Sequence, residues 1–119
     1  MYGLDPNKID SFTHVCGNEV VQVCVGRFDL QYHLNPMGHI SIWGRCELRD
    51  TESKLVDVWQ GDRRSSGFSA FIDLLGAVVS EVVIDNPSTL RLQFVDGRQL
   101  LLFDESPQYE SFSVNGIVV

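Results

Sequence analysis

The chain has 119 residues, of which 44% are apolar and 21% charged, and its formal charge at pH 7 is −7. Length and composition predict a single folded domain over residues 1–119 and exclude a disordered tail. The negative charge excludes a sequence-independent nucleic-acid binder and disfavours an anionic membrane, whereas it suits a basic partner or simply keeps the protein soluble.

The first predicted elements are a short helix and a strand. Asp5 is a suitable helix N-cap, and Ile9, Phe12 and Cys16 would share one helical face. Gly17 can adopt the left-handed conformation that ends a helix. The Val-rich segment that follows favours a strand, because β-branched side chains fit a pleated surface.

Alternation of apolar and polar residues predicts further strands in the first half of the chain. Residues 28–34 alternate with a period of two, as in a half-buried strand, and the sequence NPMGH then predicts a turn. The pattern resumes as a strand over residues 40–48. Residues 54–60 supply another strand after a polar turn.

The opening elements return in the second half. The stretch FTHVCGNEVVQVCV at residues 12–25 is similar to FIDLLGAVVSEVVI at residues 71–84, where Ser65 or Ser66 would cap a second short helix and Gly76 would end it. The predicted apolar face of this helix contains Phe68, Phe71, Ile72 and Leu75. In the strands, Leu30, Leu34, Ile40 and Ile42 correspond to Leu90, Phe94, Leu100 and Leu102.

The Asp-Gly pair in VDGRQ predicts a hairpin with two possible registers. A two-residue turn would place Leu101 beside Leu92, whereas a three-residue turn with Gly97 left-handed would place Leu100 there. Because residues 100–103 are apolar throughout, this strand is expected to be central in its sheet. A last strand is expected at residues 109–114, and the apolar tail is expected to pair or pack.

These elements predict an α+β fold that is mostly β. It consists of two pseudo-repeats, at about residues 5–60 and 65–119, each a short helix followed by an antiparallel meander. About eight strands would surround one shared core, as a sandwich or a partly closed barrel. Neither repeat alone would bury enough apolar surface to fold, so the halves are expected to fold together.

Titratable side chains do not form a pattern typical of an enzyme or a metal site. His14 is predicted on the exposed side of a helix, His33 on the wet face of a strand and His39 in a turn, so they lack the close Cys and His pairs that zinc favours. Asp104 and Glu105 are predicted to lie in a turn and to be solvated there. We therefore predict a non-enzymatic protein with no metal and no cofactor.

The three cysteines, Cys16, Cys24 and Cys46, are odd in number and lie among apolar residues. This pattern favours reduced, unreactive core thiols over a disulfide framework. No apolar run reaches the roughly 20 residues of a membrane-spanning helix, and the opening MYGLDPNKID does not have the features of a signal peptide. A cytoplasmic location is expected.

Two segments are candidates for contact with a partner. In WQGDRRSSG, Trp59, Arg63 and Arg64 combine residue types that are common at interfaces, although the segment also suits a solvated linker between the repeats. In SPQYESFSV, Tyr109 and Phe112 cannot both point to one side of a regular strand. One of these aromatic side chains is therefore expected to be exposed, unless the Tyr is a core residue with its hydroxyl bonded.

The order LLGAVVSEVVI, LRLQFVDGRQLLL and YESF resembles a group of small bacterial domains of unknown function. The resemblance covers residues 74–112 and is carried mainly by the closing Tyr-Glu-Ser-aromatic motif. Such domains look like members of the broad set that includes immunity proteins of bacterial toxin systems, which bind and block a toxin without catalytic residues. The resemblance makes Tyr109, Glu110 and Ser111 candidate contact residues.

The sequence therefore favours a protein-binding module, in one form an immunity-type protein with a basic partner. The alternative is a small-molecule binding domain with a pocket between the two halves, lined by Trp43, Trp59 or Tyr32. A homodimer is a further possibility, because sheet edges can pair.

Overall fold

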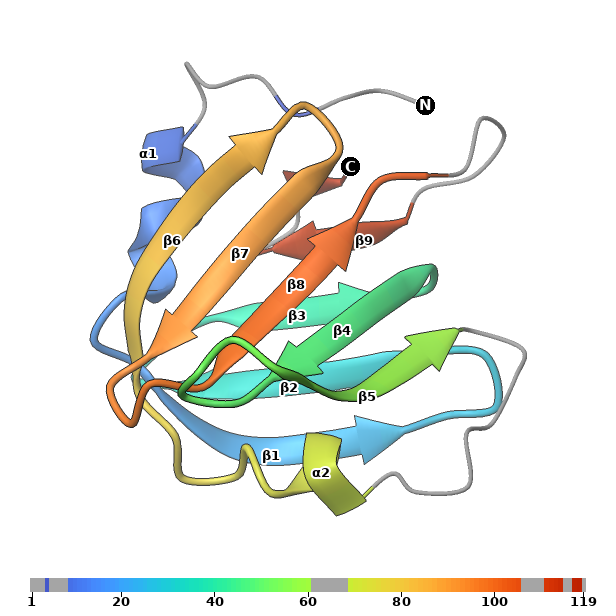
Figure 1. Cartoon of the computed structure of the whole chain (residues 1–119). Coiled ribbons are helices and arrows are strands. Elements are labelled where there is room, and N and C mark those ends of the chain that lie inside the picture. Colours follow the sequence, from blue (N-terminus) through green and yellow to red (C-terminus); the bar gives the residue numbers. More distant parts are fainter. Residues whose placement is uncertain (1–3, 5–8, 61–68, 106–110, 115–116, 119) are drawn as a thin grey trace.

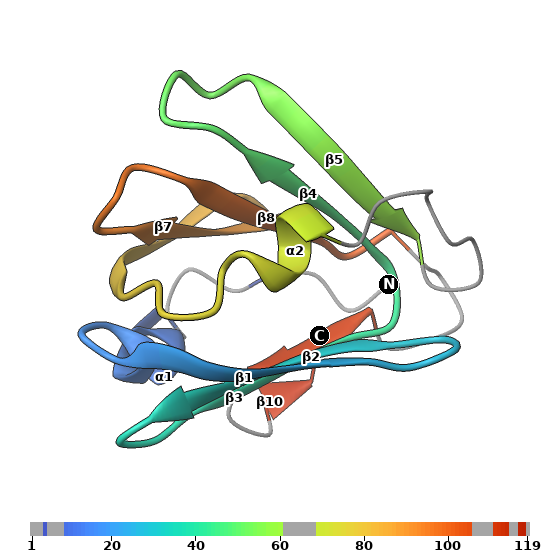
Figure 2. The same cartoon turned by 90° about the horizontal axis from the view of Figure 1, so that it is seen from below.

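A computed structural model describes residues 4, 9–60, 69–105, 111–114 and 117–118. In this part of the chain, two antiparallel sheets of five strands pack face to face, which confirms the mostly β fold predicted from the sequence (Figures 1 and 2). Sheet A contains, in spatial order, β1 (Glu19–Val25), β2 (Leu30–Asn35), β3 (His39–Ile42), β9 (Phe112–Val114) and β10 (Ile117–Val118). Sheet B contains β5 (Leu55–Gln60), β4 (Arg45–Arg49), β8 (Gln99–Phe103), β7 (Thr89–Phe94) and β6 (Val79–Asn86).

Each sheet contains strands from both halves of the sequence. In sheet A, β1, β2 and β3 of the first half are joined by β9 and β10 of the second half. In sheet B, β6, β7 and β8 of the second half are joined by β4 and β5 of the first half. Equivalent strands therefore occupy equivalent places in the two sheets, and neither half contains a complete sheet.

The chain crosses from sheet A to sheet B at Trp43 and Gly44, within a segment, residues 40–48, that was predicted to be one continuous strand. This crossover begins the exchange of strands between the two sheets. Both backbone N–H groups donate to the carbonyl oxygen of Ser111, at 2.9 Å each, and the chain passes from β3 in sheet A to β4 in sheet B. The prediction of a single strand is wrong because both strands face the same core, so the apolar pattern continues across the break. The described residues form ten strands rather than about eight.

One short helical segment precedes the first strand of each half. They are α1 (Ile9–Phe12), continued by the 3-10 helix η2 (Thr13–Val15), and α2 (Ser69–Ile72). Gly17 and Gly76, the predicted stops, have positive φ angles of 82° and 89°. The Gly17 N–H donates to the Val79 carbonyl and the Gly76 N–H to the Val20 carbonyl, both at 2.7 Å. Each glycine thus donates to the first strand of the other half, and the two equivalent hydrogen bonds join the starts of β1 and β6.

The hairpin between β7 and β8 closes with the three-residue turn. The Phe94 N–H donates to the Arg98 carbonyl at 2.9 Å, and Gly97 has a φ of 95°. Leu100 accordingly pairs with Leu92, as the second of the two predicted registers requires. The strand β8 is the central strand of sheet B, as predicted.

The core lies between the sheets and has the same pattern in both. Cross-strand partners share a face of a sheet, and the inward rows are apolar in both sheets. In sheet A these rows are Val23, Tyr32, Ile40 and Val114, and Val25, Leu30, Ile42 and Phe112. In sheet B they are Val82, Leu92, Leu100 and Leu48, and Ile84, Leu90, Leu102 and Cys46.

The helical segments lie at opposite sides of the sandwich, α1 beside β6 and α2 beside β5 (Figure 1). Phe12 of α1 and Phe71 of α2 occupy equivalent positions and are both buried in the core. The predicted apolar face of the second helix is only partly right, because Ile72 and Leu75 are exposed. The turn is too short to keep a helical stripe, and the following Leu74 is buried instead.

Several predicted features lie outside the described residues. They are the caps at Asp5, Ser65 and Ser66 and the core position of Phe68. Among the helices of the described residues, none is long and apolar enough to span a bilayer.

Candidate protein-contact surface

Trp59, predicted as a contact residue at the end of the first half, is fully buried. It lies on β5, where it pairs with Cys46 of β4, and its side chain belongs to the core between the sheets. The structure thus corrects the interpretation of Trp59 as a surface contact, because the cross-strand partner of the inward Cys46 also faces the core. Arg63 and Arg64 lie outside the described residues.

Ser111 of the closing motif is 2% exposed and has a structural role. Its carbonyl accepts the two hydrogen bonds from Trp43 and Gly44, and its hydroxyl lies 3.4 Å from Oδ1 of Asp104. Asp104 is also fully buried, so its prediction as a solvated turn residue is wrong. These contacts connect the crossover between the sheets to the segment after β8.

The aromatic residue of the closing motif is a core residue. Phe112 is fully buried on β9 and pairs with Ile42. Tyr109 and Glu110 lie outside the described residues. Phe112 is therefore not the exposed aromatic of the pair, the expectation for Tyr109 stays a prediction, and any contact role of the motif does not include Phe112 or the buried Ser111.

The outward side chains of sheet A form a surface that we name the neutral face. Two rows of cross-strand partners define it: Cys24, Gln31, Ser41 and Ser113, and Gln22, His33 and His39. No side chain in these rows is an acid, a Lys or an Arg. Two carboxylates adjoin these rows: Glu19 is the cross-strand partner of Asn35, and the Asp29 carboxylate accepts a hydrogen bond from the Gln31 amide at 2.5 Å. Figure 2 shows sheet A edge-on, with no described helix or strand lying on this outer side.

A histidine pair lies within the neutral face. His33 and His39 are cross-strand partners on β2 and β3, and their rings stack with centroids 4.5 Å apart. His39 is thus in a strand and not in the predicted turn, because the hairpin loop is shorter than the NPMGH stretch suggested. Its Nε2 lies 3.2 Å from Oε1 of Gln31 and 3.3 Å from Oγ of Ser41. Partial burial, with a smaller effect of His33, lowers the pKa of His39 and favours its neutral form.

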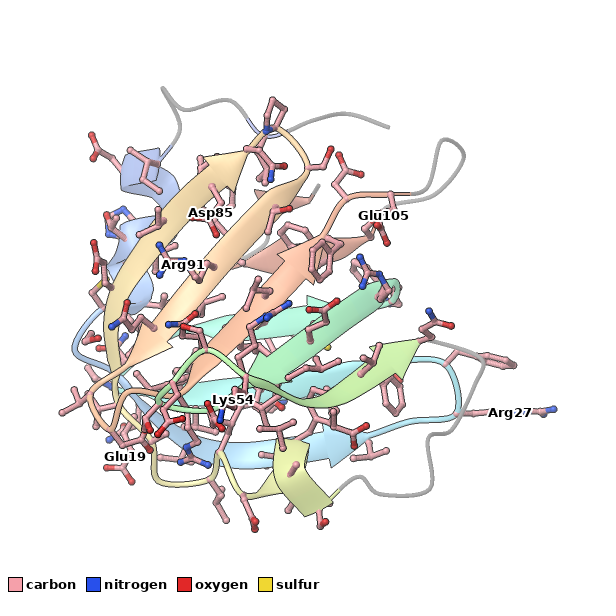
Figure 3. All side chains as sticks on the ribbon, in the orientation of Figure 1. Glu19, Arg27, Lys54, Asp85, Arg91 and Glu105 are labelled. Atoms are coloured by element: carbon pink, nitrogen blue, oxygen red, sulfur yellow. The ribbon has the colours of Figure 1, made fainter. Side chains whose placement is uncertain are left out.

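Two exposed aromatic residues lie at one end of sheet A, and we name Phe28 and Trp43 the aromatic rim. Phe28 is 56% exposed in the loop between β1 and β2, and Trp43, which follows β3, is 42% exposed. Both positions lie beyond the row that pairs Leu30 with Ile42. The guanidinium carbon of Arg27 is 5.1 Å from the Phe28 ring centroid, and Figure 3 shows Arg27 extending away from the body of the molecule.

The outward side chains of sheet B form a contrasting surface, the ion-paired face. Its equivalent rows are Val83, Arg91, Leu101 and Glu47, and Glu81, Gln93, Gln99 and Arg49. Glu47 forms ion pairs with Arg45 and, at 2.7 Å, with Arg49. Arg91 pairs with Asp85 of the neighbouring strand at 3.1 Å, as Figure 3 shows.

Arg45 links this network to the end of β8. It donates to both carboxylate oxygens of Glu105, at 2.8 and 2.9 Å, and its guanidinium carbon lies 3.9 Å from the Phe103 ring centroid. Its hydrogen bonds lower the pKa of Glu105, so the carboxylate stays ionised. Phe103, which is equivalent to Trp43 of sheet A, is therefore covered by the guanidinium of Arg45, and Arg45 is itself paired with Glu105.

The cysteine thiols differ in environment. Cys46 is fully buried, as predicted, and burial raises the pKa of its thiol, which keeps it protonated and unreactive. Cys16 is half-buried and packs against the core, whereas Cys24 is half-buried on the outer face, so the prediction of Cys24 as an interior residue is wrong. Cys24 faces outward because the apolar pattern of β1 includes both faces of an edge strand. All three thiols are free.

The residues proposed to line a pocket between the halves do not share one. Tyr32 and Trp59 are buried in the core, and the Tyr32 hydroxyl donates to the Phe71 carbonyl at 3.0 Å, whereas Trp43 is exposed at the aromatic rim. Within the described part of the chain, no group of three or more His, Cys, Asp or Glu side chains is placed to hold a metal ion.

Comparisons with protein-family models, with curated proteins and with solved structures find no match to this chain.

Proposed function

We propose that this protein is a non-enzymatic protein-binding module whose contact surface is the neutral face with its aromatic rim. The observation that carries this proposal is the contrast between the two outer faces. Equivalent rows of outward side chains form ion pairs on sheet B and are uncharged on sheet A. The centre of a protein interface is depleted of charged residues and enriched in aromatic ones, as this face is.

The aromatic rim supplies the anchor that such a surface needs. Trp residues are frequent among the few interface residues that contribute most of the binding energy. Trp43 is exposed and free of the arginine that covers the equivalent Phe103. Binding would therefore bury a large apolar ring without first breaking an ion pair.

The net charge of −7 favours a basic partner approaching this face. An overall negative field speeds encounter with a positively charged protein, while the uncharged contact surface adds little desolvation cost. An immunity-type protein that blocks a toxin is the form of module suggested by the resemblance of LLGAVVSEVVI, LRLQFVDGRQLLL and YESF. A toxin encoded beside its gene is accordingly the first partner to test.

The test is co-purification with the product of the adjacent gene, followed by calorimetry. We expect a complex at micromolar concentration whose affinity falls with added salt. Trp43→Ala should weaken it by at least about tenfold, a loss in the range of an interface hot spot. Phe103→Ala, the equivalent change on sheet B, is the matched control and should leave affinity unchanged. Absence of a complex, together with no protection against the toxin, would reject the proposal.

A further inference from the structure

A chain of hydrogen bonds on the outer side of sheet A fixes which ring nitrogen of His39 carries a hydrogen. The Asp29 carboxylate accepts from the Gln31 amide at 2.5 Å, and Oε1 of Gln31 lies 3.2 Å from Nε2 of His39. Carboxylate and amide oxygens only accept hydrogen bonds. Gln31 therefore turns its nitrogen toward Asp29 and its oxygen toward His39, so Nε2 of His39 is a donor.

The hydrogen bond from His39 to Gln31 persists when the ring gains a proton. The neutral ring already donates from Nε2, so an added proton binds at Nδ1, and the imidazolium still donates to the same amide oxygen. Protonation thus adds a positive charge at this position without requiring the Gln31 amide to turn.

The surroundings of His39 oppose that charge. The ring stacks on His33 with centroids 4.5 Å apart, and two positive charges at such a distance repel each other. Partial burial and, to a smaller extent, His33 lower the pKa of His39. His39 is therefore neutral at pH 7.5 and gains its proton only below the ordinary histidine pKa of about 6.5.

Within the described part of the chain, no carboxylate lies in the rows around the histidine pair. The Asp29 carboxylate is separated from His39 by the Gln31 amide, and Glu19 is the cross-strand partner of Asn35. The other members of these rows are Gln22 on β1, Gln31 on β2, Ser41 on β3, Ser113 on β9 and the outward Cys24 of β1.

The histidine pair lies within the neutral face and not at its edge. His33 is on β2 and His39 on β3, and these strands lie between β1 and β9 in sheet A. A charge there would be enclosed by a partner that covers the face, so solvent and salt would screen it less than a charge at the rim. Like charges that meet inside a contact weaken binding.

We propose that the pair of His33 and His39 makes partner binding pH-dependent, so that the neutral face binds a basic protein when both rings are neutral and releases it when they are protonated. This inference rests on the proposed function, since it describes the regulation of the same surface. Because a basic partner and protons oppose each other at this face, complex formation at acidic pH must release protons from the pair.

The experiment is calorimetric titration of the full chain with the product of the adjacent gene at pH 7.5 and 5.5. Each titration uses two buffers of different ionisation enthalpy, so that released protons are measured as heat. The double variant His33→Gln/His39→Gln removes both titrating rings from the face. His14→Gln is the matched control, because His14 is exposed on η2, outside the face. Circular dichroism at both pH values confirms that each variant is folded.

The dissociation constant of the wild type should rise at least about tenfold between pH 7.5 and 5.5, because like charges then meet inside the contact. His14→Gln should show the same ratio within about twofold, whereas the ratio in the double variant should stay below about threefold. Comparing ratios removes the contribution of the partner's own titration. A double variant with the wild-type ratio, or binding heats at pH 5.5 that do not depend on the buffer, would overturn the inference.

A second measurement needs no partner. Nuclear magnetic resonance of the histidine ring protons follows the titration of His39 in the free wild type and in His33→Gln. The titration of His39 should move to higher pH in this variant, because the neighbouring positive charge is removed. An unchanged titration of His39 overturns the inference even when a partner binds.

The outcomes separate the inference from the proposed function. A complex of equal affinity at both pH values overturns the pH dependence and leaves the protein-binding module intact. No complex at pH 7.5 rejects the module, and the pH dependence with it.

Discussion

Sheet A and sheet B have the same strand order and the same inward rows, yet their outer faces differ at almost every equivalent position. Gln31 on sheet A corresponds to Arg91 on sheet B, Ser41 to Leu101, and Ser113 to Glu47. The interior is constrained by the packing of both sheets on one core, whereas the outward positions are free to vary. The similarity of the inward faces therefore reflects the packing of one shared core, whereas the difference between the outward faces reflects a difference in their contacts with the surroundings.

The largest expected loss of stability tests whether the two halves contribute equally to the shared core. Phe12→Ala and Phe71→Ala each remove a buried ring at equivalent positions beside the core. Each should lower the free energy of unfolding by about 3–5 kcal/mol, because a cavity replaces the lost packing. Urea unfolding followed by circular dichroism measures both.

The two losses should agree within about 1 kcal/mol if the halves share one core in the same way. Phe28→Ala is the control, since this ring is exposed, and its effect should stay near about 0.5 kcal/mol. Unequal losses at Phe12 and Phe71 would show that the similar backbones conceal different packing.

A smaller effect is expected on the ion-paired face. Glu47→Gln removes the carboxylate that bonds to Arg45 and Arg49, and Glu47 is only 9% exposed. The unfolding free energy should fall by about 1–2 kcal/mol, because hydrogen bonds to charged groups in a partly desolvated site are lost. In the exposed pair with Lys54, Glu52→Gln should cost less than about 0.5 kcal/mol. Equal costs for the two carboxylates would contradict a structural role of this network.

The smallest effect concerns the histidine pair of the neutral face. The pKa of His39 is lowered in the folded protein, so the unfolded chain binds the proton more readily and stability falls as pH drops below the ordinary histidine pKa of about 6.5. The charged form would face His33, with the uncharged Gln31 and Ser41 beside it. Urea midpoints at pH 7.5 and 5.5, at a concentration where the protein is monomeric, should differ less in His39→Gln than in the wild type.

Two ion-paired carboxylates, Asp96 and Glu105, titrate below this pH window. The pKa values of Asp96 and Glu105 are lowered by hydrogen bonds from Arg98 and Arg45, so their contributions are lost only at more acidic pH. An undiminished pH dependence in His39→Gln would show that another group controls stability between pH 5.5 and 7.5.

Much of the fold could be predicted from the sequence, because local chemistry and period agree there. The repeated Gly17 and Gly76 stops, the alternation in β2 and β7, and the turn around Gly97 each have a local physical cause. The break at Trp43 could not be predicted, since the apolar period continues through it. Its cause is the distant Ser111 carbonyl. The exchange of strands between sheets is therefore a tertiary feature that no local pattern encodes.

The contact surface was predicted less well than the fold. Trp59 and Ser111 were selected for residue type and motif, but burial depends on which side of a strand faces the core, and that was not assigned for β5 or β9. A signal for the neutral face was present in the sequence. Comparing outward positions of the two repeats, such as Gln31 with Arg91, would have shown that one face lacks charge.

The exchanged strands also determine the smallest unit that can fold. A single repeat expressed alone would contain three strands of one sheet and two strands that belong to another. It could complete both only by associating with a complementary fragment, so its folding would depend on concentration. Covalent linkage of the two repeats replaces that dependence with a high effective concentration, which makes assembly an intramolecular step.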